Sequence, residues 1–158
     1  MKRLLLFFAL ILTGGVTATL LFAAMTDSQA QKLWRQITEE SPYSRWHHVD
    51  SEVSGQKSGA PYAPYYRIYA REAPPKAKGA PADYGTVLVR ENLSADKRLQ
   101  GVTVMYKIEN YNSDAGDWFW AKYTADGQVE EAGKVRKCIG CHSFAAGNDY
   151  IFDRWAQR

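Results

Sequence analysis

Two cysteines and a histidine stand together near the end of this 158-residue chain, in the run Cys138-Ile139-Gly140-Cys141-His142. The C-x-x-C-H spacing is the attachment pattern of a c-type haem. Positions i, i+3 and i+4 of a helical turn share one face, so both thiols can bond the haem vinyl groups while the imidazole reaches the iron. No other cysteine is present. The motif predicts one covalent haem c per chain, bound by Cys138 and Cys141, with His142 as the proximal iron ligand.

Three other uses of these cysteines fit their place in the chain less well. A thioredoxin-like redox pair would lie between a strand and a helix near the start of a βαβ unit, whereas this pair lies close to the C-terminus. A zinc site would need further ligands, and the other histidines are only His47 and His48. A structural disulfide is the third alternative. Covalent haem is therefore the favoured interpretation.

The sequence offers no clear ligand for the opposite side of the iron. An electron-transfer cytochrome c usually has an axial Met or His there. Neither residue type occurs after His142, and the upstream candidates are Met105, His47 and His48, for which core or surface roles are commoner. The sequence favours a five-coordinate iron with an open position. That arrangement suits the binding of a small molecule such as nitric oxide, or the oxidation of a small substrate.

The start of the chain has the pattern of an export signal. A charged pair, Lys2-Arg3, precedes mostly apolar residues that extend from Leu4 to Ala24. Cleavage after Ala18 or after Ala30 would make this segment a signal peptide, residues 1–30 at its longest. An uncleaved segment 4–24 would instead be long enough to anchor the chain in a membrane. Both alternatives place the remaining domain, residues 31–158, outside the cytoplasm, which predicts a periplasmic location.

Composition and charge exclude one class of partner. Hydrophobic residues make up 46% of the chain, enough for a core, and 20 basic against 17 acidic residues give a net charge of +3. Lys2 and Arg3 lie in the export signal, so the remaining domain is close to neutral. A dedicated nucleic-acid binder would show a basic stripe, and nucleic acid is therefore not expected as a partner.

The middle of the chain predicts one helix followed by four strands. Ala30, Leu33, Trp34 and Ile37 form one helical face, and Ser41-Pro42 ends this helix. Strand composition or alternation predicts strands over 65–70, 85–91, 102–108 and 117–124. Glycine and proline predict loops over 45–64 and 73–81. We therefore expect an α+β fold, a mainly antiparallel β-sheet with an N-terminal helix and a C-terminal haem-bearing helical segment.

The alternation also predicts which strand residues share a face. In the second strand, Val87 and Val89 lie on one face, with Leu88 and Arg90 on the other. In the third strand, Val102, Val104, Tyr106 and Ile108 lie on one face, with Thr103, Met105 and Lys107 on the other.

The last hundred or so residues resemble the cytochrome P460 / cytochrome c′-beta family, in the order and spacing of several short stretches. Besides the haem motif and the strand 65–70, the matching stretches are 85–91 (GTVLVRE), 102–107 (VTVMYK), 116–123 (GDWFWAKY), 133–135 (GKV) and 148–152 (NDYIF). The resemblance implies a mainly antiparallel sheet with helices, a homodimer, and a high-spin haem c whose proximal ligand is His142.

The family's two branches differ in chemistry. Cytochrome P460 oxidises hydroxylamine and carries a lysine bonded to the porphyrin, whereas cytochrome c′-beta binds nitric oxide without that bond. The matching triplet here is Val89-Arg90-Glu91, and a protonated guanidinium is a poor nucleophile. The strand 102–108 also lacks the carboxylate that the oxidising enzymes use. Arg90 is therefore predicted either to act as a distal cation over the haem or to be a paired surface residue.

We therefore expect an extracytoplasmic c-type cytochrome that binds a small gaseous or nitrogenous ligand, such as nitric oxide, or carries electrons to a redox partner. The alternative is an oxidoreductase acting on hydroxylamine or a related nitrogen compound. A porphyrin-bonded lysine would favour that alternative, and Lys76, Lys78 and Lys107 are the available candidates.

Overall fold

The computed structural model describes residues 26–49, 56–57, 64–71 and 79–152. The predicted export signal or anchor lies almost wholly outside these residues. The described part begins with a helix over residues 26–35, which continues as a π-helical turn, Gln36–Glu40, and ends at Ser41. A 3-10 turn, Tyr43–Arg45, leads into the sheet. Among the described residues, no helix is both long enough and apolar enough to cross a membrane.

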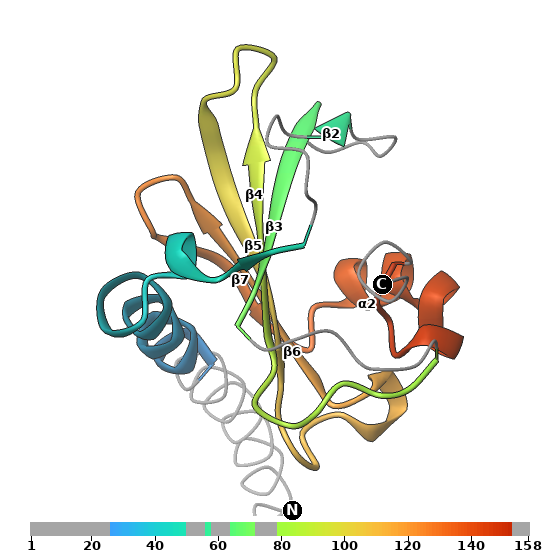
Figure 1. Cartoon of the computed structure of the whole chain (residues 1–158). Coiled ribbons are helices and arrows are strands. Elements are labelled where there is room, and N and C mark those ends of the chain that lie inside the picture. The colour runs from blue at the N-terminus through green and yellow to red at the C-terminus, as the bar shows by residue number, and fades with distance from the viewer. Residues whose placement is uncertain (1–25, 50–55, 58–63, 72–78, 153–158) are drawn as a thin grey trace, which may run out of the picture.

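One antiparallel sheet forms the centre of the molecule (Figure 1). Its strands lie in the order β1-β3-β4-β5-β6-β7, and β2 pairs with β3. The strand bounds are β1 His47–His48, β2 Gln56–Lys57, β3 Tyr65–Ala70, β4 Val87–Leu93, β5 Leu99–Lys107, β6 Trp118–Thr124 and β7 Val129–Gly133. A 3-10 turn, Ser113–Ala115, precedes β6; helix α2, Arg136–His142, and the 3-10 segment Ser143–Asn148 follow β7.

The α+β fold is confirmed, and several element bounds differ from the prediction. The predicted loop 45–64 contains two short strands, β1 and β2, that pair with β3. Strand β4 covers Val87–Leu93 rather than 85–91, because Gly85 has a left-handed φ of 93° and belongs to the turn before it. Strand β5 starts at Leu99, ahead of its predicted start, and β7 was not predicted.

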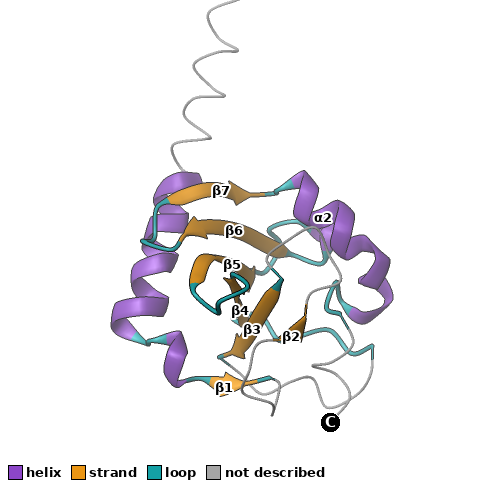
Figure 2. Ribbon diagram, turned by 90° about the horizontal axis from the view of Figure 1, so that it is seen from above, coloured by secondary structure: helices purple, strands orange, loops and turns teal. Residues whose placement is uncertain are grey.

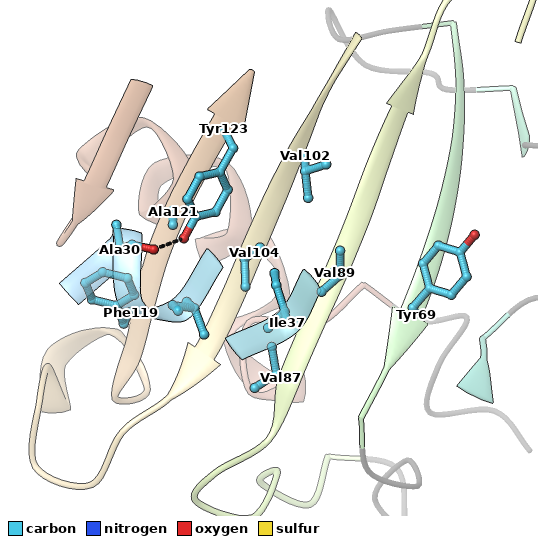
Figure 3. Packing of buried hydrophobic residues seen from close by; sticks show 11 residues of the cluster. Ala30, Ile37, Tyr69, Val87, Val89, Val102, Val104, Phe119, Ala121 and Tyr123 are labelled. Atoms are coloured by element: carbon cyan, nitrogen blue, oxygen red, sulfur yellow. Dashed lines mark hydrogen bonds between the residues drawn. The ribbon is translucent and has the colours of Figure 1, made fainter. Parts of the chain in front are cut away.

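The N-terminal helix and α2 cover opposite faces of the sheet (Figure 2). On one face the helix packs against what we call the helix-side core (Figure 3). Its buried members are Ala30, Leu33, Ile37, Tyr69, Val87, Val89, Val102, Val104, Phe119, Ala121 and Tyr123. The Tyr123 hydroxyl donates a hydrogen bond of 2.8 Å to the carbonyl of Ala30. The predicted helical face and the inward direction of the four strand valines are thereby confirmed.

The other face carries a second cluster, which we call the α2-side core. Its buried members are Val49, Ala70, Ala82, Leu88, Met105, Trp118, Trp120 and Ile151. Cys138 and Ile139 of α2 pack against it. The sheet therefore separates two apolar clusters, and the C-x-x-C-H motif belongs to only one of them.

Candidate functional site

Helix α2 carries all three residues of the predicted attachment motif. Cys138, Cys141 and His142 lie within the helix Arg136–His142, and both cysteines are free thiols and half-buried. Burial, with the nearby charge of Glu131, raises the pKa of the Cys138 thiol to about 11. At neutral pH this thiol is therefore protonated and available as S–H.

The imidazole of His142 is held in a defined orientation. Its Nδ1 lies 2.7 Å from the carbonyl oxygen of Tyr150. A carbonyl only accepts hydrogen bonds, so Nδ1 carries the proton and the lone pair of the neutral ring is on Nε2. The ring also contacts Trp120, with centroids 4.7 Å apart, and Phe152, with centroids 4.9 Å apart.

The surroundings of His142 favour the neutral, metal-binding form of its ring. Burial lowers the pKa of His142, the hydrogen bond to Tyr150 opposes that shift, and the positive charge of Arg90 adds to it. An imidazole that donates through Nδ1 and offers Nε2 is the usual state of a metal-ligating histidine.

Arg90 lies on the α2 side of the sheet, as the alternation predicts. Its cross-strand partners are Ile68 and Thr103, and its neighbour Leu88 is in the α2-side core. The guanidinium hydrogen-bonds to the side chain of Asn92 and lies 4.7 Å from the centre of the Tyr66 ring. Arg90 is therefore on the same side as His142, and whether it lies over a haem stays a prediction.

The other candidate ligands differ in where they lie. Met105 is buried in the α2-side core, 8% exposed. The ring of His48 contacts Tyr69, with centroids 5.2 Å apart, and Tyr69 belongs to the helix-side core. His47 is exposed on strand β1.

Of the three candidate cross-linking lysines, the structure describes Lys107. Its ammonium nitrogen lies 2.6 and 2.8 Å from the two carboxylate oxygens of Asp149. Lys76 and Lys78 lie outside the described residues.

Sequence reasoning missed several groups around the motif. Three of these groups contact His142: the Tyr150 carbonyl and the rings of Trp120 and Phe152. The fourth is the ion pair between Lys107 and Asp149, and Asp149 is next to Tyr150 in the chain. The spacing of residue types in the sequence cannot identify a main-chain carbonyl as a hydrogen-bond acceptor. It also cannot pair Lys107 with Asp149, because the two residues are far apart in the sequence. The resemblance included these stretches without assigning them roles.

The residues of this site fit a haem. Two free thiols lie one helical turn apart on α2, and the neighbouring imidazole has a nitrogen that the Tyr150 bond does not occupy. The indole nitrogen of Trp120 is also buried and has no hydrogen-bond partner in the described part of the chain. A buried polar group without a partner costs free energy, so this N–H is consistent with an additional group bound beside His142.

Comparison with known proteins supports the same interpretation. A family model described as Cytochrome P460 matches residues 41–153, a range that includes all the described strands of the sheet and the whole of α2. No curated protein matches this chain.

Proposed function

This chain belongs to the cytochrome P460 family, and we propose that it is an extracytoplasmic c-type cytochrome whose haem binds small ligands such as nitric oxide, carries electrons, or does both. Membership of the family implies a haem cofactor. In this proposal one haem is bonded to Cys138 and Cys141 and its iron is ligated by His142. The domain works as a homodimer in the periplasm.

The observation that carries the proposal is the hydrogen bond from His142 Nδ1 to the Tyr150 carbonyl, at 2.7 Å. It fixes the ring's proton on one nitrogen and leaves the other for a metal. A bond of this kind also makes the imidazole a stronger donor to the metal. A surface histidine would have no need of such a partly buried acceptor.

The two cysteines support covalent attachment. Each thioether would form by addition of the S–H group across one vinyl double bond, with the hydrogen going to the other vinyl carbon and no leaving group. Cys138 is held as a protonated thiol by its raised pKa of about 11. The haem then supplies an iron that can bind a ligand or exchange an electron.

The position of His48, one of the possible second ligands, supports an open position on the iron. The ring of His48 packs on Tyr69 of the helix-side core, on the other side of the sheet. Met105 lies on the same side of the sheet as His142, and in this proposal it is a packed residue of the α2-side core and not an iron ligand. The α2 side also presents a cation, Arg90, whose charge reaches His142.

The alternative function, hydroxylamine oxidation, depends on a lysine bonded to the porphyrin. Among the described residues, the candidate Lys107 is engaged in a buried ion pair with Asp149. A protonated, paired ammonium is a poor nucleophile. The ligand-binding function is therefore the one that we propose.

The test uses protein expressed with the haem-attachment machinery. We expect the wild type to retain its haem through acid–acetone extraction and the Cys138→Ser/Cys141→Ser variant to lose it. The ferrous protein should show the absorption spectrum of a five-coordinate haem and bind nitric oxide. Freely extracted haem would overturn covalent attachment. A strongly red-shifted Soret band, with a lysine-containing peptide joined to the haem peptide, would restore the hydroxylamine-oxidising alternative.

A further inference from the structure

We propose that Lys107 and Asp149 are positioning residues for the iron ligand, because their buried ion pair fixes the turn whose carbonyl holds the His142 ring. This inference rests on the proposed function, in which His142 ligates the haem iron. Among the hydrogen bonds and ion pairs of the described residues, neither side chain is joined to the imidazole. They act through the backbone at Asp149 and Tyr150.

The ion pair joins the sheet to the segment that follows α2. Lys107 is at the end of β5, and its ammonium contacts both carboxylate oxygens of Asp149, at 2.6 and 2.8 Å. The two side chains are only 6% and 8% exposed. Burial of two charges has a desolvation cost that their attraction often fails to recover. The pair therefore needs a reason other than stability alone.

Asp149 is held at further points. Its carboxylate accepts a hydrogen bond of 2.8 Å from the backbone N–H of Ala82. Its carbonyl accepts one of 2.9 Å from the indole N–H of Trp118 in β6. The carboxylate is thus satisfied by an ammonium and an amide, and the main chain is tied to a second strand.

The backbone at this point adopts a conformation that L-residues avoid. Asp149 and Tyr150 are consecutive and have φ values of 52° and 63°. Two non-glycine residues in the left-handed region persist only where the surroundings impose that conformation. The contacts of Asp149 and the hydrogen bond from Tyr150 N–H to the Ala145 carbonyl, at 2.9 Å, supply that constraint.

The direction of the Tyr150 carbonyl depends on this turn. With both residues left-handed, the carbonyl lies 2.7 Å from His142 Nδ1. If the turn relaxed toward ordinary backbone angles, the acceptor would move away from the ring. The chain of contacts therefore runs from β5 and β6, through Asp149, to the imidazole, and it sets both the orientation and the donor strength of the iron ligand.

The test compares two charge-conserving double variants of the haem-loaded protein. Lys107→Met/Asp149→Asn removes the buried pair, and asparagine tolerates left-handed backbone. The matched control is Lys122→Met/Glu130→Gln, which removes the exposed pair between β6 and β7, with its 3.0 Å contact. Because each variant loses one positive and one negative charge, net charge does not explain any difference between them.

The readouts are the iron–histidine stretching band of the ferrous protein, by resonance Raman spectroscopy, and the reduction potential. We expect the Lys107→Met/Asp149→Asn variant to shift the band to lower frequency and to raise the potential, because a weaker Nδ1 bond makes the imidazole a weaker donor. The control should match the wild type. Lys107→Arg should keep the wild-type band, since a guanidinium also pairs with a carboxylate.

An unchanged band in the double variant, or an equal shift in the control, would overturn the positioning role. If the double variant does not accumulate as folded protein, the single variant Asp149→Asn tests the positioning role instead, with the iron–histidine band and the reduction potential as its readouts. A wild type without any iron–histidine band would instead overturn the proposed function. In that case nitrogen-15 NMR of the His142 ring, at fixed pH, tests whether the Nδ1–H form is lost in the double variant.

Discussion

By the resemblance described above, Arg90 is expected at the strand position of the cross-linking lysine, and it lies on the same side of the sheet as His142. A guanidinium there would form charge-assisted hydrogen bonds with an anion on the iron, worth roughly 1.5–3 kcal/mol each. We expect Arg90→Leu to weaken azide binding to the ferric protein by about ten- to a hundredfold, and nitric oxide binding to the ferrous protein by much less. Spectroscopic titration with each ligand measures both effects.

Arg98→Leu is the matched control for this change. Arg98 is exposed and pairs with Asp96 at 2.6 Å, so its loss removes the same charge away from α2. Equal effects of Arg90→Leu on both ligands, or the same anion effect in the control, would show that Arg90 only supports the strand through Asn92 and Tyr66.

The sequence could identify only part of the site. Cys138, Cys141 and His142 could be found because their spacing in one helical turn is itself the signal. The acceptor for His142 could not, because any residue type supplies a main-chain carbonyl and only the tertiary turn at Tyr150 places it there. Lys107 could be assigned to a strand face, but its partner, Asp149, lies too far along the chain for any local pattern to connect them.

At the scale of elements, prediction succeeded where alternation was strong. The valines of β4 and β5 and the apolar face of the N-terminal helix all lie in the helix-side core. Strand β7 was missed because its sequence, VEEAG, has little strand propensity. Its strand form depends on pairing with β6, which is tertiary context.

The turn between β6 and β7 packs closely on the N-terminal helix. Gly127 has φ +88°, and a Cβ added there would lie 2.3 Å from the indole nitrogen of Trp34. We expect Gly127→Ala to lower the free energy of unfolding by about 1–3 kcal/mol from backbone strain alone, with a further loss because Trp34 must move. Urea unfolding of the two proteins measures the difference.

Gly147→Ala serves as the comparison for this loss. A Cβ at Gly147 would meet no atom within 4 Å, and its φ lies outside the strained range. This variant should unfold within about 0.5 kcal/mol of the wild type. If Gly127→Ala were equally stable, the turn would not be a fixed part of the contact with the helix.

At the scale of the whole molecule, the predicted location outside the cytoplasm can be tested directly. We expect an alkaline phosphatase fused after Arg158 to be active, because that enzyme needs export, and the same fusion without residues 1–24 to be inactive. Equal activity of the two fusions would contradict an N-terminal export signal. Carbonate washing of membranes then distinguishes a retained anchor from a cleaved signal.

Light scattering on the haem-loaded protein tests the proposed homodimer.

The separation of the two cores by the sheet has a consequence for biosynthesis. None of the described members of the helix-side core belongs to α2. This core can therefore form before any haem is bound. We expect the Cys138→Ser/Cys141→Ser protein to protect the amides of Val104 and Tyr123 from hydrogen exchange while those of residues 138–142 exchange freely. Equal protection of both sets of amides, or protection of neither, would show that the helix-side core and α2 form together. The haem-attachment machinery would thus receive a chain in which the helix-side core has already formed and the cysteines of α2 are still accessible.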